Sequence, residues 1–328
     1  MSDRIAIVGD GQMGLVLAEQ LAFTGHRVRI WGPFPESLAA LETSRRSPRL
    51  PGLVLPESIE IEPDPARILD GAEAAISAIP VQFLRSVWTR IPTTDVPLVS
   101  VSKGIETTTL ERPLEILAEL RGPVPAAVLS GPTIASELAR HRPAAMVAAG
   151  TEAAWTEAVQ AMFLAPWMRV YTSVDPIGVE IAGAAKNVVA LAAGILDGLE
   201  AGYNAKSALL ARGLAEIARL GAAHGARPET FSGVAGVGDL ATTCFCPEGR
   251  NRTCGEAIGR GVPLQRHLRE TDSVVEGVET ARAIRRLAGD RGVEMPIVEA
   301  VHAVLFEGQA PQDALAELMQ RAVGSELA

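Results

Sequence analysis

Short apolar runs alternate with segments of helical periodicity along the first half of the chain. Many residues of these runs are β-branched, and several runs are apolar throughout, as expected for parallel strands that helices cover on both faces. Between the first two runs, residues 13–24 carry apolar side chains at helical spacing. This alternation predicts right-handed βαβ units and an α/β doubly wound sheet. The predicted strands are residues 5–8, 27–31, 74–79, 96–101, 126–129 and 145–148.

The pattern changes near residues 171–178, beyond which Ala, Leu, Gly and Arg recur at helical spacing and strand signals are nearly absent. We therefore predict two domains, an α/β domain over residues 1–175 and an all-α domain over residues 176–328. In the first domain, the proline-rich stretch 47–65 is expected to form an exposed loop. The helices predicted in the second are residues 207–223, 251–259, 278–288, 297–305 and 311–323.

The most apolar helical segment, residues 176–196, is interrupted by Glu180 and Lys186. Its longest uncharged piece after the lysine, residues 187–196, is shorter than the about 20 apolar residues that a bilayer requires. The N-terminus lacks the basic region and the long apolar region of a secretory signal. We therefore expect this segment to be a helix buried in protein and the chain to be soluble and cytoplasmic, without stable membrane insertion.

Composition narrows the classes of partner. The chain has 328 residues and a net charge of −9, which argues against nucleic acid or an anionic membrane as the main partner. Only three of its 30 basic residues are lysines, namely Lys103, Lys186 and Lys206. The cysteines lack C-x-x-C spacing and a nearby fourth ligand, so we expect no metal site and a reducing compartment. They are Cys244, Cys246 and Cys254.

A glycine motif, G-x-G-x-x-G, follows the first predicted strand and opens the first predicted helix. Gly9 allows a tight turn, Gly11 lets the backbone approach a pyrophosphate, and Gly14 lets the helix pack on the strand. The helix N-terminus then faces the phosphates, so the motif predicts dinucleotide binding. The acidic residue that would bind the ribose is missing where the second strand ends, at residues 29–34, and the choice between NAD and NADP stays open.

Two of the lysines stand where catalysis would need them. Lys103 follows a predicted strand and therefore lies at the carboxyl edge of the sheet, where open α/β folds bind ligands. Lys186 lies among small and apolar residues, and burial lowers the pKa of an ammonium so that it can exchange protons near neutral pH. The alternative is a structural ion pair of Lys186 with Glu180 or another acid.

Polar residues of the second half add candidate substrate groups. Asp239 ends a glycine-rich apolar segment, where it could cap a helix, bond a substrate hydroxyl or hold a lysine. Arg250, Asn251 and Arg252 stand beside a predicted helix start, a combination suited to forked binding of phosphate.

Taken together, these segments resemble bacterial NAD(P)-dependent glycerol-3-phosphate dehydrogenases. The resemblance implies an N-terminal Rossmann domain, a C-terminal helical domain that binds substrate, and an oxidoreductase of phospholipid synthesis. Its reaction would be reversible hydride transfer between NAD(P)H and dihydroxyacetone phosphate, giving sn-glycerol 3-phosphate, in a possible homodimer. Besides the glycine turn, the similar motifs are residues 79–85, 102–106, 130–133, 185–187, 212–216, 235–240, 250–252, 275–277 and 294–297.

The resemblance also implies residue roles. Lys186 would donate or accept the proton, with Lys103 and Asp239 completing the catalytic group. Substrate would contact Lys103, Gly131, Thr133, Lys186, Asn187, Asp239 and Thr243, and its phosphate Gly249, Arg250 and Asn251. The cofactor would contact Gly9, Gly11, Gln12, Met13, Gly14, Phe83, Lys103, Ala135, Arg250, Val274 and Glu276.

Four positions depart from the family pattern. Gln12-Met13 stands where relatives have Ser-Trp, and Thr133 and Gly249 each replace a serine. Two other functions remain as alternatives, a related β-hydroxyacid or 6-phosphogluconate-like dehydrogenase and a non-catalytic dinucleotide sensor. The first lacks support from Asp239 and Arg250, and a sensor has no use for a proton donor such as Lys186.

Overall fold

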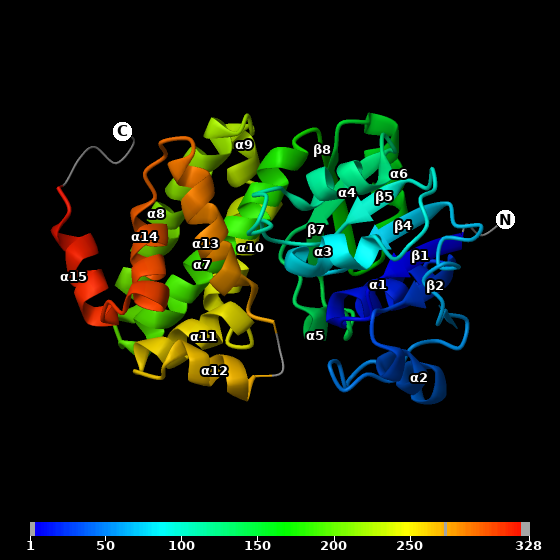
Figure 1. Cartoon of the computed structure of the whole chain (residues 1–328), viewed down its shortest axis with the longest axis horizontal. Coiled ribbons are helices and arrows are strands. Elements are labelled where there is room, and N and C mark those ends of the chain that lie inside the picture. The colour runs from blue at the N-terminus through cyan, green and yellow to red at the C-terminus, as the bar shows by residue number, and fades with distance from the viewer. Residues whose placement is uncertain (1–3, 272–273, 323–328) are drawn as a thin grey trace.

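The computed structural model describes residues 4–271 and 274–322, and it places a sheet in the first half of the chain beside a helical second half (Figure 1). The sheet has eight strands in the order β3-β2-β1-β4-β5-β6-β7-β8. All six predicted strands are present, and the α/β plus all-α fold class is confirmed. The strands are β1 (Arg4–Val8), β2 (Arg27–Trp31), β3 (Glu60–Ile61), β4 (Ala74–Ser77), β5 (Leu98–Ser100), β6 (Ala126–Ser130), β7 (Ala144–Gly150) and β8 (Met168–Ser173).

From β1 the chain first winds outward to β3 and then crosses to β4 on the other side of β1. The strands from β3 to β6 are parallel, with Ile5 of β1 opposite both Val28 of β2 and Ala74 of β4. Ligands of such sheets bind at the carboxyl ends of the strands where the winding reverses, which is here between β1 and β4.

Three features of the sheet were not predicted, one of which is the short strand β3. Strand β7 runs antiparallel to β6, with Ala127 opposite Gly150, and the connection between them contains the helix α5 (Ala135–Leu138). Strand β8 pairs with β7 at the end of the sheet, and its buried Met168 and Val170 alternate with exposed residues. This period of two was a readable signal for a half-buried strand.

Helices cover both faces of the sheet. Side chains of β1 alternate between the faces, because Ile5 and Ile7 pack in one apolar cluster while Ala6 and Val8 pack in another. The first cluster includes side chains of α1 and α6, and the second includes side chains of α3 and α4. These helices are α1 (Gln12–Phe23), α2 (Pro35–Ser44), α3 (Val81–Trp88), α4 (Pro113–Arg121), α5 (Ala135–Leu138) and α6 (Ala153–Phe163).

The proline-rich stretch 47–65 is not the exposed loop that was predicted. Leu50, Leu53, Leu55 and Ile59 are buried in the apolar cluster of α1, and the stretch includes β3. Prolines prevent long regular elements here, but the apolar side chains between them still bury their surface against the sheet.

The helical half is built around one long helix, α7 (Pro176–Gly198), whose described side chains are buried from Gly178 to Leu196. This helix is long and apolar enough to cross a membrane, but its most apolar window is entirely inside the protein, as predicted. Around it lie α8 (Gly202–Ala223), α9 (Pro228–Phe231), η1 (Val234–Gly238), α10 (Asp239–Phe245), α11 (Arg250–Gly259), α12 (Leu264–Glu270), α13 (Glu276–Gly289), α14 (Pro296–His302), η2 (Ala303–Glu307) and α15 (Pro311–Gln320).

All five helices predicted in this half are present, although α14 ends early and continues as the π-helical turn η2. The predicted end of the last helix, residue 323, lies outside the described residues. Helices α7 and α11 pack with their backbones in direct contact, since a side chain at Gly194 or Gly255 would overlap main-chain oxygens of the facing helix. This close packing fixes the start of α11 relative to α7.

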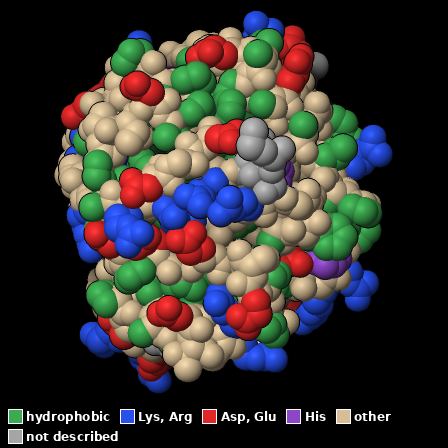
Figure 2. All heavy atoms as spheres, turned by 90° about the vertical axis from the view of Figure 1, so that its right-hand side faces the viewer, with side chains coloured by type: hydrophobic (Ala, Val, Ile, Leu, Met, Phe, Trp, Pro, Cys, Tyr) green, Lys and Arg blue, Asp and Glu red, His purple; other side chains and the backbone are tan. Residues whose placement is uncertain are grey.

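Figure 2 shows the outer face of the sheet-bearing half, where acidic and basic side chains lie intermingled. That face therefore presents mixed charge, in keeping with a chain whose net charge is only −9 over 328 residues.

Candidate active site

The glycine turn has the form that the motif predicts. Gly9 has φ of +123°, and a side chain there would lie 2.5 Å from the oxygen of Ala78. Gly14 has no room for a side chain against the oxygen of Gly9, whereas Gly11 faces open space. No side chain within the described chain caps the N-terminus of α1, so its backbone N–H groups face that open space. The turn therefore fits a pyrophosphate, as a strand-to-helix cradle.

Asp10 lies between Gly9 and Gly11 in the turn, and its side chain reaches the segment after β2. Its carboxylate is buried against Gly32, accepts a hydrogen bond from the Ser37 hydroxyl, and lies 3.9 Å from the guanidinium of Arg49. Gln12 donates to the backbone oxygen of Arg49 at 2.5 Å. Asp10 therefore joins the glycine turn to the segment after β2.

Lys103, Lys186 and Asp239 meet between the sheet-bearing half and the helical half of the chain. Lys103 comes from the segment after β5, Lys186 from the middle of α7, and Asp239 begins α10. One carboxylate oxygen of Asp239 lies 2.6 Å from the Lys103 ammonium, and the other lies 2.5 Å from the Lys186 ammonium. Lys186 also donates to the Thr243 hydroxyl at 2.6 Å. The predicted catalytic group is thus one hydrogen-bonded cluster.

Burial decides the proton affinity of Lys186. The side chain is almost fully buried, and loss of hydration lowers its pKa to about 8. The Asp239 carboxylate opposes this shift, and the nearby positive charge of Lys103 adds to it. A lysine in this state can give up and regain a proton near neutral pH.

Of the ion-pair partners considered for Lys186, Glu180 is wrong and another acid, Asp239, is the one found. Glu180 lies six residues earlier on α7, which places it on a different face of the helix. Its carboxylate instead lies 2.5 Å from the guanidinium of Arg112 and accepts the backbone N–H of Leu114 at 2.8 Å. Burial raises the pKa of Glu180 to about 7. This contact joins α7 to the start of α4.

Two asparagines connect the helices beside the cluster. Asn251 donates to the side-chain oxygen of Asn187 at 3.0 Å and accepts the backbone N–H of Gly277 at 2.9 Å. Asn187 in turn donates to Glu276 at 3.4 Å. The starts of α11 and α13 are therefore tied to the middle of α7, one residue from Lys186.

The two arginines of residues 250–252 lie in different surroundings. Arg250 is exposed at the start of α11, and Gly249 before it supplies no side-chain cap. Arg252 does not join it as predicted, because its guanidinium lies 2.6 Å from Asp197 and 3.3 Å from Glu256. Only one guanidinium of the pair is thus available for a phosphate, since successive helical residues point in different directions.

Other predicted contacts lie around the cluster. The Gly131 oxygen accepts hydrogen bonds from Lys103 and from the Thr133 hydroxyl, each at 3.2 Å. Phe83 on α3 and Val274 before α13 are about half exposed. Met13 lies in the first turn of α1, and Ala135 begins α5. The cofactor roles of these last four residues stay predictions.

Lys206, for which the sequence offered no role, is a buried ion-pair residue. Its ammonium lies 2.5 Å from the Asp197 carboxylate and 5.3 Å from the centre of the Phe245 ring. Since Asp197 also binds Arg252, one carboxylate at the end of α7 connects α8 and α11. Asp197 itself was missed, because nothing in its local sequence marks it.

The three cysteines are free thiols. Cys244 and Cys254 are buried, and burial raises the pKa of each thiol to about 12. Over residues 4–271 and 274–322, no cluster of His, Cys, Asp and Glu side chains could hold a metal ion.

Two family models match the chain, NAD-dependent glycerol-3-phosphate dehydrogenase N-terminus over residues 4–156 and C-terminus over residues 175–316. The chain belongs to the NAD-dependent glycerol-3-phosphate dehydrogenase family. The resemblance of its motifs is therefore confirmed, as is the expected class of NAD(P)-dependent oxidoreductase acting on a CH–OH group.

Curated relatives cover almost the whole chain. It is 44% identical to glycerol-3-phosphate dehydrogenase (NAD(P)+) 2 of Salinibacter ruber, over 99% of this chain and 97% of that one. It is 44% identical to glycerol-3-phosphate dehydrogenase (NAD(P)+) of Frankia casuarinae, over 98% of each. The crystal structure of glycerol-3-phosphate dehydrogenase from Coxiella burnetii is 34% identical and superposes with a TM-score of 0.94, covering 98% of this chain and 99% of that one.

Proposed function

We propose that this family member is an sn-glycerol-3-phosphate dehydrogenase (NAD(P)+) that reduces dihydroxyacetone phosphate for glycerophospholipid synthesis. The observation that carries the proposal is the buried Lys186, held by Asp239 and Thr243 and facing Lys103. Ketone reduction needs a proton source beside a hydride donor, and this cluster supplies one next to a dinucleotide-binding fold.

The dinucleotide would lie at the carboxyl edge of the sheet. Gly9, Gly11 and Gly14 with the N-terminus of α1 would hold its pyrophosphate, since Gly11 leaves space for its approach. When bound, the nicotinamide supplies or takes up the hydride. The other residues proposed to contact it are Gln12, Met13, Phe83, Lys103, Ala135, Arg250, Val274 and Glu276.

Lys186 would complete the reduction. As the carbonyl carbon receives the hydride, its oxygen gains negative charge and takes a proton from the Lys186 ammonium. In the reverse direction the neutral amine accepts the hydroxyl proton, which its lowered pKa allows. Asp239 orients both ammonium groups, and the Lys103 charge favours the electron-rich oxygen.

The substrate phosphate would bind at the start of α11. Arg250 and Asn251 stand in the first turn, where the helix dipole favours an anion and Gly249 leaves the N–H groups uncapped. The remaining substrate contacts proposed are Lys103, Gly131, Thr133, Asn187 and Thr243.

We propose a matching division of labour, with residues 1–175 binding the dinucleotide and residues 176–328 supplying the phosphate and proton-transfer groups. We also propose a cytoplasmic location, a possible homodimer, and no nucleic-acid partner or stable membrane insertion. Mixed surface charge and the burial of α7 support the last two points.

The test follows NADH and NADPH absorbance with dihydroxyacetone phosphate in wild type and in Lys186→Ala. Lys186→Met serves as a second variant of nearly equal length, and thermal unfolding checks that each variant is folded. We expect oxidation by wild type with at least one cofactor and a large loss of kcat in both variants. No oxidation with either cofactor would overturn the function, and full activity of the variants would overturn the role of Lys186.

A further inference from the structure

Lys103 reaches the active site from the segment between β5 and α4, residues 101–112, which we call the Lys103 loop. All of its residues are described, and they form turns but no helix or strand. Few backbone hydrogen bonds form within the loop. Two of them join the Glu106 N–H to the Glu111 oxygen and the Leu110 N–H to the Glu106 oxygen. The position of the Lys103 ammonium therefore depends on contacts that other elements make with the loop.

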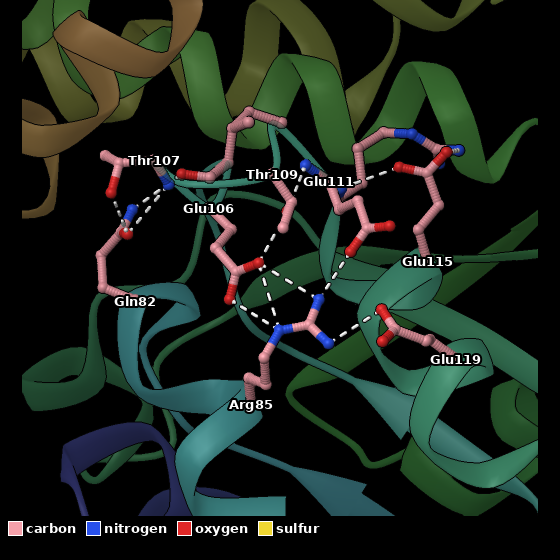
Figure 3. Close-up of polar contacts among 10 residues, drawn as sticks. Gln82, Arg85, Glu106, Thr107, Thr109, Glu111, Glu115 and Glu119 are labelled. Carbon is pink, nitrogen blue, oxygen red and sulfur yellow. Dashed lines mark hydrogen bonds and ion pairs between the residues drawn. The ribbon is translucent and has the colours of Figure 1, made fainter.

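Gln82, on the first turn of α3, holds the middle of the loop. Its amide nitrogen donates to the Ile105 oxygen at 2.7 Å. Its amide oxygen accepts from the Thr107 backbone N–H at 3.1 Å and from the Thr107 hydroxyl at 3.0 Å (Figure 3). One side chain thus satisfies three polar groups of the loop, two to four residues from Lys103.

Arg85, one turn further along α3, holds the loop at two points and fastens it to α4. Its guanidinium lies 3.2 Å from the Glu106 carboxylate and 2.7 Å from that of Glu111, both in the loop. It also lies 2.8 Å from Glu119 of α4, and Figure 3 shows it at the centre of these acids. Glu106 is buried and takes a further hydrogen bond from the Thr109 hydroxyl at 2.6 Å. The guanidinium is planar and carries several N–H donors, so it can contact these three carboxylates together. The neighbouring carboxylates raise the pKa of Arg85.

The opposite side of the loop rests on α13 of the helical half. Arg286 donates to the Thr107 oxygen at 2.5 Å. Gly104 has φ of +111°, and a side chain there would lie 2.8 Å from Val81 of α3 and 3.4 Å from Thr280 of α13. The loop is therefore packed between α3 and α13, and its contacts with α3 contribute to the position of Lys103.

We propose that Gln82 and Arg85 are positioning residues of the active site, holding the Lys103 loop so that the Lys103 ammonium stands against Asp239. The inference rests on the proposed function. It explains why the 79–85 and 102–106 motifs occur together: one carries the side chains that hold the other.

The position of Lys103 has an electrostatic consequence that can be measured. The titratable groups that face Lys186 are Lys103, Asp239 and Cys244, and burial keeps the Cys244 thiol protonated. The positive charge of Lys103 disfavours a second positive charge at Lys186. Withdrawal of Lys103 therefore raises the proton affinity of Lys186, and the alkaline limb of the rate profile for ketone reduction moves to higher pH.

The experiment compares Arg85→Met and Gln82→Met with Lys103→Met as reference and Glu119→Gln as matched control. Glu119 contacts the same guanidinium but lies on α4, so its loss leaves the loop contacts in place. We measure the pH profile of kcat/KM and the KM for dihydroxyacetone phosphate with saturating dinucleotide. We expect the alkaline limb to move upward in Lys103→Met and, by less, in Arg85→Met and Gln82→Met. Their KM should rise about tenfold, and Glu119→Gln should match wild type.

Each outcome decides the question. Lower thermal stability in Arg85→Met and Gln82→Met, with the pH limb and KM of wild type, would make both residues merely structural and overturn the inference. Glu106→Gln weakens the same contact without removing Arg85, and it serves if Arg85→Met does not fold, with the same upward shift expected. If Lys103→Met kept the pH profile and KM of wild type, the inference would be overturned as well. The proposed function, by contrast, fails only if wild type does not oxidise NADH or NADPH.

Discussion

Replacing Gly277 with alanine tests how tightly the substrate side of the site is built. A methyl group at Gly277 would lie 2.7 Å from the Asn187 backbone oxygen and 2.8 Å from the Asn251 side-chain oxygen. Ordinary contact begins at 3.4 Å, so one of the three elements must move by about 0.6–0.7 Å. Asn251 cannot turn aside freely, because its oxygen accepts the Gly277 N–H and its nitrogen donates to Asn187.

The expected effects follow from that displacement. Overpacking costs about 1–3 kcal/mol, and the better helix propensity of alanine returns about 1 kcal/mol at most. A shift of this size beside the turn proposed to bind the phosphate should lower kcat/KM for dihydroxyacetone phosphate by about tenfold or more. The assay combines steady-state kinetics of ketone reduction with urea unfolding.

Gly289→Ala is the matched control, because Gly289 ends the same helix and no atom lies within 4 Å of the added methyl group. This variant should keep wild-type kinetics and unfold no more easily than wild type, since alanine has the better helix propensity. If Gly277→Ala also behaved like wild type in both measurements, the asparagine contacts would not be setting the geometry of the site, and the reasoning would be refuted.

Three further predictions concern charge. The rate of ketone reduction should fall above about pH 8, because Lys186 must be protonated to donate and its pKa lies below the ordinary lysine pKa of 10.5. A kcat profile that stays flat to about pH 10 would contradict this prediction. Arg250→Met should raise the KM for dihydroxyacetone phosphate by at least about tenfold with a smaller change in dinucleotide affinity. Equal weakening of both would mean that Arg250 serves chiefly the cofactor. Burial raises the pKa of Glu216 in the folded protein to about 7, whereas its ordinary value is 4.5. Between these pH values the folded protein holds a proton that the unfolded chain has released, so the free energy of unfolding falls as the pH rises. Glu216→Gln has no such proton to lose. In urea unfolding, the free energy of unfolding of this variant relative to that of wild type should therefore increase from about pH 5 to pH 8, by up to about 3 kcal/mol.

Features that depend on neighbours in the chain were predictable. The glycine turn, the six strands and the buried α7 follow from periodicity over a few residues, and each is present. The burial of Lys186 was predictable for the same reason, since small and apolar residues surround it on every face of one helix. Errors arose where local pattern and packing disagree, as in stretch 47–65, where prolines suggested exposure but leucines are buried.

The sequence by itself determined the fold class, the dinucleotide cradle and the lysines that could carry chemistry, because a strand, a helix and a turn are each specified by contiguous residues. Only the tertiary structure decided which charges meet. Lys186 pairs with Asp239, 53 residues away, and Lys103 pairs with the same carboxylate across 136 residues. Lys206 pairs with Asp197, and Arg252 joins it there instead of facing the site. Ion-pair energy depends on distance in space and on burial, and residue spacing specifies neither until the two halves of the chain have packed.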